Sequence, residues 1–65
     1  MDETYEVILN GTHRMRLSPG DTIKFDRLGD TFTGPNWEHT VTKLGTFKFE
    51  RIVNGAAEFT LIFKD

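Results

Sequence analysis

The sequence predicts an all-β domain, a small antiparallel barrel or sandwich of five or six strands with no substantial helix. Three observations lead to this prediction. Apolar and polar residues alternate with a period of two in several short segments, which is typical of strands with one buried face. Turn-forming residues separate these segments at intervals of about 8 to 12 residues, as in small barrels and sandwiches. No segment of useful length repeats its apolar residues with the period of a helix.

The first two predicted strands, residues 4–10 and 12–17, join at Asn10-Gly11. Both turn residues tolerate positive φ, which the tight turns of β-hairpins require. Both faces of the first strand carry apolar residues, so we expect it to be central in the sheet or covered on both sides. Its expected inward residues are Tyr5, Val7 and Leu9.

Ser18-Pro19-Gly20-Asp21 forms the next predicted turn. Proline presets φ at the second position and Gly20 accepts positive φ at the third, as a type II turn requires. The third strand then covers residues 22–28, with Ile23 and Phe25 facing the core.

Residues 29–36 lack a strand pattern and are rich in turn formers, so they are expected to form the longest loop. Alternation resumes over residues 36–44 and 46–53, and Asn54-Gly55 repeats the first hairpin signal before a last strand at 56–64. An SH3-like barrel is the favoured arrangement. The inward residues predicted for the last two strands are Phe47, Phe49, Val53, Phe59, Leu61 and Phe63.

The length of 65 residues predicts one small domain, residues 1–65, with residues 1–3 frayed. There is no cysteine, which excludes a disulfide framework and a thiolate metal site. The apolar runs are too short to span a membrane, and the acidic start does not resemble a signal peptide. We therefore expect a cytoplasmic protein that does not associate with membranes.

The net charge of −2 conceals a locally basic region. Residues 13–27 carry four basic against two acidic side chains, whereas residues 1–12 carry only acidic ones. An outward stripe of basic residues would hold a phosphate backbone or an acidic protein surface, and the alternative is a solvated strand face. The candidate partner- or RNA-binding residues are Arg14, Arg16 and Lys24, together with Arg27 and His13.

Phe32 and Trp37 flank the Gly34-Pro35 turn. Aromatic side chains on a constrained loop are typical anchors of protein interfaces, so both are candidate partner-binding residues. For Trp37 the favoured alternative is a core position that plugs one end of the barrel. For Phe32, which lies within the predicted loop, the two roles remain open.

No constellation of residues points to catalysis. The two histidines have no metal-motif spacing, and Ser18 has no base close to it in the sequence. No glycine-rich loop precedes a helix, and a domain this small rarely holds a deep cleft. We therefore expect a non-enzymatic protein with no metal and no cofactor.

The pattern Tyr5-Glu6-Val7-Ile8, Gly11, Arg16, Gly20-Asp21, Ile23 and Leu28 resembles the amino-terminal half of the bacterial large-subunit ribosomal protein twenty-one family. The likeness runs without gaps over residues 5–28. It implies a small barrel and an RNA-facing edge in the Gly11–Arg16 region. The arginine-rich carboxy-terminal segment of that family has no counterpart in this sequence.

Together these observations predict a small β module that binds a larger protein or ribonucleoprotein, such as a phage or bacterial accessory protein. Two alternatives remain. One is an RNA-binding or ribosome-associated barrel that uses the Arg14, Arg16 and Lys24 face. The other is a homo-oligomeric structural protein of the virion type, assembled through strand edges.

Overall fold

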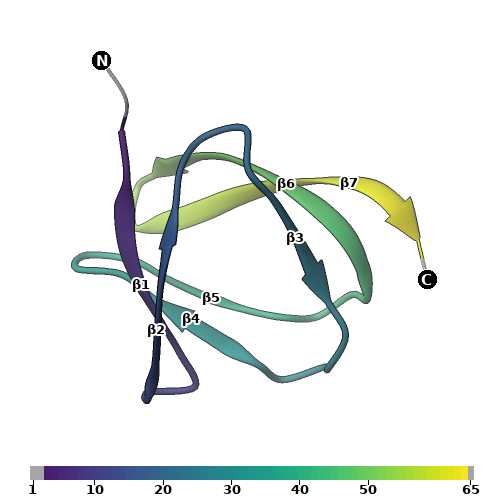
Figure 1. The fold of residues 1–65 in the computed structure, drawn as a ribbon, viewed down its shortest axis with the longest axis horizontal. Coiled ribbons are helices and arrows are strands. Elements are labelled where there is room, and N and C mark those ends of the chain that lie inside the picture. Colours follow the sequence, from purple (N-terminus) through teal and green to yellow (C-terminus); the bar gives the residue numbers. More distant parts are fainter. Residues whose placement is uncertain (1–2, 65) are drawn as a thin grey trace.

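The computed structural model describes residues 3–64, and these residues form strands and turns without a helix (Figure 1). This confirms the all-β class predicted from the sequence. Residues 1–3 were expected to be frayed, and residues 1 and 2 of this segment lie outside the described residues. The seven strands are β1 (Tyr5–Leu9), β2 (His13–Leu17), β3 (Thr22–Phe25), β4 (Thr31–Thr33), β5 (Glu38–Thr40), β6 (Gly45–Val53) and β7 (Ala56–Lys64).

The strands form one curled sheet in the order β2-β1-β4-β5-β7-β6-β3, an open half-barrel rather than a two-sheet sandwich (Figure 1). All pairings are antiparallel except a single parallel pair between β5 and β7. The edge strands β2 and β3 follow each other in the chain but diverge without pairing. The turn between them continues the pairing of β3 with β6. There, the Gly20 amide donates to the Phe49 carbonyl and the Phe49 amide donates to the Asp21 carbonyl, both at 2.8 Å.

The turns predicted from the sequence are confirmed. Asn10 and Asn54 both have a φ of 51°, and the glycine after each has a φ of 78°, the left-handed conformation that tight hairpins need. At the Ser18–Asp21 turn, Gly20 has a φ of 94° and the Asp21 amide donates to the Ser18 carbonyl at 2.9 Å. The Asp21 carboxylate also accepts from the Ser18 amide at 2.8 Å, which further fixes this reversal.

The prediction that residues 29–36 form a strandless loop is wrong, because β4 lies within this segment. Thr31–Thr33 pairs with β1 on one side and β5 on the other. The Asn10 side chain holds the start of β4, since its Oδ1 accepts from the Thr31 amide at 2.9 Å. Because turn formers lie on both sides of these three residues, the sequence pattern does not reveal the strand. The strands before and after it in the chain, β3 and β5, are also shorter than predicted. The third strand ends at Phe25 rather than residue 28, and β5 covers only Glu38–Thr40.

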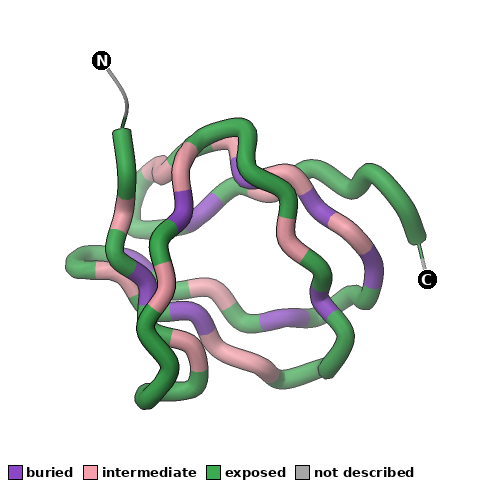
Figure 2. Tube along the Cα trace, viewed as in Figure 1, coloured by how far each residue is buried: buried purple, intermediate pink, exposed green. Residues whose placement is uncertain are grey.

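The core fills the inside of the curl, where buried positions come singly along most strands (Figure 2). Phe25 is at its centre, with its ring centroid 4.8 Å from that of Phe47, 5.1 Å from Phe59 and 5.4 Å from Phe32. Packed aromatic rings supply much of the apolar area that so short a chain can bury. The buried residues are Val7, Leu17, Phe25, Phe32, Trp37, Val41, Phe47, Phe49 and Ala57.

Two irregularities in the β6–β7 pairing overturn part of the predicted core. Phe49 pairs with Phe59 and Arg51 with Glu58, so Glu50 is an extra residue in β6. An extra residue reverses which face the following side chains occupy. As a result Ile52, rather than the predicted Val53, packs against the core.

The second irregularity adds a residue to β7. Phe47 pairs with Leu61 and Thr46 with Phe63, so Ile62 is extra. Phe63 therefore shares the face of Thr46, opposite to that of the buried Phe47, and is 68% exposed. The predicted inward position of Phe63 is therefore wrong, and Leu61, although it shares the face of Phe47, is not buried as predicted but 45% exposed.

Candidate functional site

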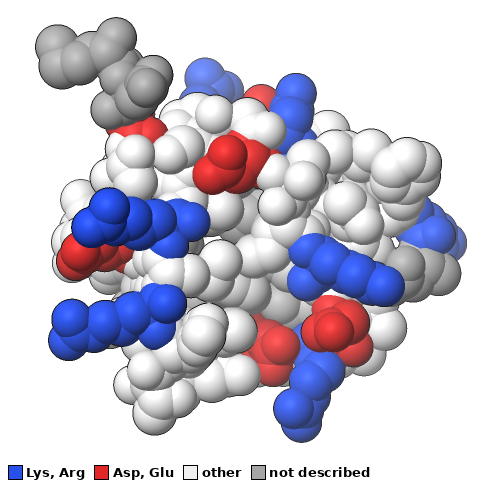
Figure 3. All heavy atoms as spheres, in the orientation of Figure 1, with Lys and Arg blue, Asp and Glu red and all other residues white. Residues whose placement is uncertain are grey.

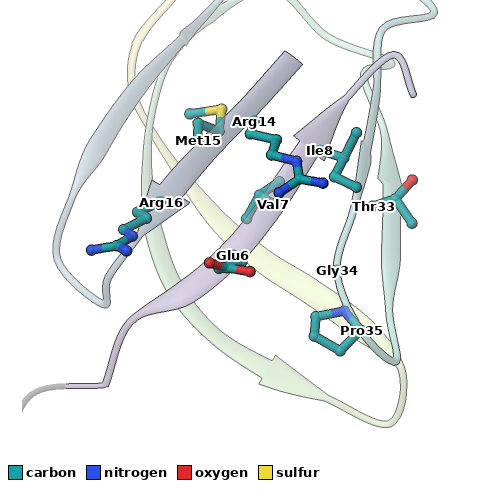
Figure 4. A pocket seen from close by; sticks show the side chains of 9 residues that line it. All are labelled: Glu6, Val7, Ile8, Arg14, Met15, Arg16, Thr33, Gly34 and Pro35. Carbon is teal, nitrogen blue, oxygen red and sulfur yellow. The ribbon is translucent and has the colours of Figure 1, made fainter. Parts of the chain in front are cut away.

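The two arginines of β2 lie on the outer surface beside a cleft of about 480 Å³. Arg16 pairs across the strands with Glu6, and Arg14 pairs with Ile8. Figure 4 shows Glu6 between Arg16 and the turn that contains Pro35. Within residues 3–64 neither arginine forms an ion pair, so both guanidinium groups remain available for a carboxylate or a phosphate. The cleft is lined by Glu6, Val7, Ile8, Arg14, Met15, Arg16, Thr33, Gly34 and Pro35.

The other predicted basic residues do not join the arginines through strand pairing. Lys24 lies on β3, at the opposite end of the sheet order, where it pairs with Thr46. Arg27 follows β3 in an exposed turn, and His13 begins β2 and is exposed. On the face shown in Figure 3, Lys and Arg side chains form separate patches, with Asp and Glu patches among them. The continuous stripe expected from the sequence is therefore divided.

Phe32 and Trp37 lie in the core, so neither is the exposed partner-binding anchor that the sequence offered as one role for them. Phe32 is only 3% exposed and Trp37 is 5% exposed. The Trp37 ring stacks on Phe49 at 6.5 Å and covers Gly34, where any Cβ would collide with the indole. This is the core role that the sequence favoured for Trp37. Neither side chain offers a partner an accessible surface.

A third surface, which contains none of the predicted site residues, is the free edge of β7, residues 58–64. We call it the β7 edge. Strand β7 pairs along its length with β6, but on its other side it meets β5 only at the pair Glu38–Ala56. Its apolar residues Leu61, Ile62 and Phe63 are all exposed. The β7 edge therefore combines unpaired backbone with adjacent apolar side chains.

A cleft of about 550 Å³ lies beside the first part of the β7 edge, where β5 and β7 separate. Three of the aromatic rings that line it, those of Phe25, His39 and Phe59, are in mutual contact. The His39 ring is 4.7 Å from that of Phe59 and 5.5 Å from that of Phe25. Burial in these surroundings lowers the pKa of His39, which disfavours its charged form. The cleft is lined by Phe25, His39, Thr42, Lys43, Phe47, Glu50, Ala57, Glu58, Phe59 and Thr60.

Polar contacts with β6 fix the side chains at the start of the β7 edge. Arg51 Nε donates to Glu58 Oε1 at 2.7 Å, and Thr60 Oγ1 donates to Glu50 Oε2 at 2.7 Å. The hydrogen bond from Thr60, together with nearby Lys48, holds the pKa of Glu50 below its usual value despite some desolvation. These contacts hold the polar side chains of Glu58 and Thr60 against β6, and they do not cover the apolar residues further along β7.

Residues 3–64 contain no cluster of His, Asp and Glu side chains suited to holding a metal ion. None of the described residues belongs to a helix that is long and apolar enough to cross a membrane. Comparison with family models, curated proteins and solved structures found no match to this chain. The resemblance to the ribosomal protein family therefore stays a prediction, and the proposals below depend on the geometry of this chain.

Proposed function

We propose that this domain is a non-enzymatic protein-binding module that takes an extended segment of its partner as an added strand along the β7 edge. The observation that carries this proposal is the conjunction of apolar exposure and missing strand pairing at residues 61–63. Strand addition uses the backbone groups of a free edge for affinity and the neighbouring side chains for specificity.

The β7 edge lacks most of the features that keep sheet edges from binding other chains. Natural edges are commonly shortened, or blocked by proline or by charged side chains. Here the edge strand is nine residues long, and its charged residues Glu58 and Lys64 lie at the two ends of the unpaired part. The three residues Leu61 to Phe63 between them are apolar, so an added strand would remove both apolar side chains and backbone groups from water.

The cleft between β5 and β7 supplies a second contact for the same ligand. A strand laid along β7 would place every second side chain over this cleft, because side chains alternate between the faces of a sheet. His39 and Phe59 would contact apolar side chains there, and Lys43 and Glu58 line the same cleft with opposite charges. We therefore expect an extended ligand with apolar residues at alternate positions.

A library of extended peptides displayed on phage tests this proposal directly. Peptides selected on the immobilised domain should be rich in alternating apolar residues, and Ile62→Lys should weaken their binding by about tenfold or more because it places a charge in the apolar contact. Ile8→Lys is the matched control, since Ile8 is a similarly exposed isoleucine on β1. Equal losses in the two variants, or amide protection that spares residues 58–64 in the complex, would reject the proposal.

A second candidate function, RNA binding, is favoured by one observation. Arg14 and Arg16 lie next to each other on the outer face and form no ion pair within the described residues. A pair of free guanidinium groups beside an open cleft can contact successive phosphates. The acidic Glu6 lies between them and the turn at Pro35, and it reduces the local positive charge.

A gel-shift titration with single-stranded RNA tests this second candidate. Binding at low salt should weaken in the double variant Arg14→Ala/Arg16→Ala, with a shallower salt dependence because fewer phosphates are neutralised. The double variant Lys43→Ala/Lys48→Ala removes the same charge elsewhere and serves as the control. Absence of binding at low salt, or equal losses in the two double variants, would remove RNA as the partner.

A further inference from the structure

We infer that Asn54, in the turn between β6 and β7, is a site of spontaneous deamidation whose product loosens the junction of β5 and β7. The chain has two Asn-Gly turns with the same φ values, 51° at each asparagine and 78° at each glycine. Only one of the two asparagine side chains is held in place by hydrogen bonds. This modification is independent of what binds the β7 edge.

An asparagine that precedes glycine can convert its side-chain amide to a carboxylate without an enzyme. The backbone nitrogen of the glycine loses its proton to water and forms a bond to the side-chain carbonyl carbon of the asparagine. The side-chain nitrogen takes up a proton and leaves as ammonia, and water then opens the five-membered imide at one of its two carbonyl carbons. The product is aspartate, or isoaspartate when the backbone runs through the former side chain. Glycine favours the reaction because no side chain crowds the attacking nitrogen.

Asn10 is protected because both ends of its amide group are hydrogen-bonded. Its Oδ1 accepts from the Thr31 backbone amide at 2.9 Å, and its Nδ2 donates to Asp30 Oδ1 at 3.1 Å. Since Nδ2 is the group that leaves as ammonia, reaction at Asn10 must break the bond to Asp30. The bond to Thr31 restricts the side-chain rotation that brings the carbonyl carbon to the Gly11 nitrogen.

Asn54 has no such restraint. Its side chain is exposed and makes no hydrogen bond with another residue of the described range 3–64. Gly55 is also exposed, so water reaches both reacting groups. Rotation of the Asn54 side chain toward the Gly55 nitrogen therefore breaks no hydrogen bond of the side chain.

The position of Asn54 gives the modification a structural effect. Its turn joins Val53 to Ala56, which pair with each other across two residues. Ala56 is also the residue at which β7 pairs with β5, opposite Glu38. Isoaspartate adds one carbon to the backbone of this turn, and the geometry of a two-residue turn fixes the register of its hairpin. The added carbon therefore displaces Ala56 from its partners and loosens the junction of β5 and β7.

Incubation of the whole chain at mildly alkaline pH, followed by tryptic digestion and mass spectrometry, tests the site. Cleavage after lysine and arginine places Asn54 in the peptide of residues 52–64 and Asn10 in a different peptide. In the folded protein Asn54 should convert at least about tenfold faster, because reaction at Asn10 costs hydrogen bonds of its side chain. In urea the two rates should converge, since both asparagines then precede glycine in an unrestrained chain.

Asp30→Ala is the matched variant, since it removes the bond to Asn10 Nδ2 and leaves the sequence around both asparagines unchanged. It should raise the rate at Asn10 in the folded protein and leave the rate at Asn54 as in the wild type. Equal rates at the two asparagines of the folded wild type, or a difference that persists in urea, would overturn the inference. So would an Asn54 that converts in urea but stays intact in the folded protein.

Amide hydrogen exchange of the isoaspartate form, separated by chromatography, tests the effect on the junction. Protection should fall in β5 and at the start of β7 when this form is compared with Asn54→Asp, which carries the same charge without the added carbon. Equal protection in the two forms would show that the modification leaves the junction of β5 and β7 intact, and would overturn that part of the inference.

Discussion

The hairpins β1–β2 and β6–β7 contain the same kind of turn but differ in the regularity of their strand pairing. Both reverse at Asn-Gly, and the backbone φ values of the two turns are identical. The β1–β2 hairpin pairs residue for residue from Tyr5–Leu17 to Leu9–His13 without interruption. The β6–β7 hairpin is nearly twice as long and is interrupted twice, by Glu50 on one strand and Ile62 on the other.

The difference shows how an extra residue creates a surface. In β1–β2 the alternation of the sequence is preserved, so the charged Glu6, Arg14 and Arg16 stay outside and Val7 and Leu17 stay inside. In β6–β7 the extra residue Ile62 turns Phe63 away from the core, as bulges commonly do near sheet edges. The regular hairpin thus presents charge to the solvent, and the irregular one presents apolar side chains.

The largest effect is expected from Phe49 in the irregular hairpin, and Phe63 in the same hairpin is its control. Phe49→Ala should cost about 3 to 5 kcal/mol of unfolding free energy, because it leaves a cavity in place of a fully buried side chain. For a domain of this size such a loss leaves the chain largely unfolded. Phe63→Ala should change stability by less than about 0.5 kcal/mol. Urea denaturation followed by circular dichroism measures both, and similar losses would mean that Phe63 is buried.

Gly45→Ala should have the next largest effect. Gly45 has a φ of 147°, and a Cβ there would collide with the carbonyl oxygen of Phe63 on the opposite strand. Strain of this kind costs about 1 to 3 kcal/mol. Gly11→Ala in the regular hairpin is the control, since its φ is 78° but its Cβ would meet open space. The urea midpoint should fall further for Gly45→Ala, and the reverse order would contradict the close approach of β6 and β7.

A smaller effect is expected from pH through His39. Burial lowers its pKa below the usual 6.5, so the unfolded chain takes up the proton first as the pH falls. The contribution of His39 to the free energy of unfolding is therefore fully present above about pH 6.5 and is lost as the pH falls below it. Urea midpoints across this range should decline for the wild type and decline less for His39→Gln. Parallel curves would show that another group causes the decline. The pKa of Glu50 is also lowered, and the stability that this carboxylate contributes is lost only when the pH falls below its usual pKa of 4.5.

The smallest effect is expected from the ion pair between Arg51 and Glu58. Both side chains are largely exposed, and ion pairs at the surface contribute little after solvent screening. Arg51→Gln should therefore leave the urea midpoint within error of the wild type. A clear drop that disappears at high salt would show that this pair anchors the irregular hairpin more firmly than its exposure indicates.

Local chemistry explains which parts of the fold were predictable from the sequence. The turns at Asn10, Gly20 and Asn54 depend on φ preferences of the residues themselves, and all three are in place. The alternation in β1 and β2 depends on one uninterrupted register, which the structure has. By contrast β4 is held by strands on both sides and by the Asn10 side chain, and no pattern within three residues could indicate such partners.

The candidate surfaces divide in the same way. The shared face of Arg14 and Arg16 was predictable, because residues two apart on one strand point to the same face of the sheet. The grouping with Lys24 was not, since it depends on whether β2 and β3 pair. The burial of Phe32 depends on β4, and the exposure of Phe63 depends on the extra residue at Ile62.

Backbone preferences and a period of two, both readable from the amino-acid order, therefore set the all-β class, the positions of the reversals and the faces of the regular strands. The order of the strands, the opening between β5 and β7 and the apolar β7 edge became visible only in the folded chain. A strand's second neighbour and a single extra residue depend on packing across the sheet, because residues far apart in the chain compete there for the same core.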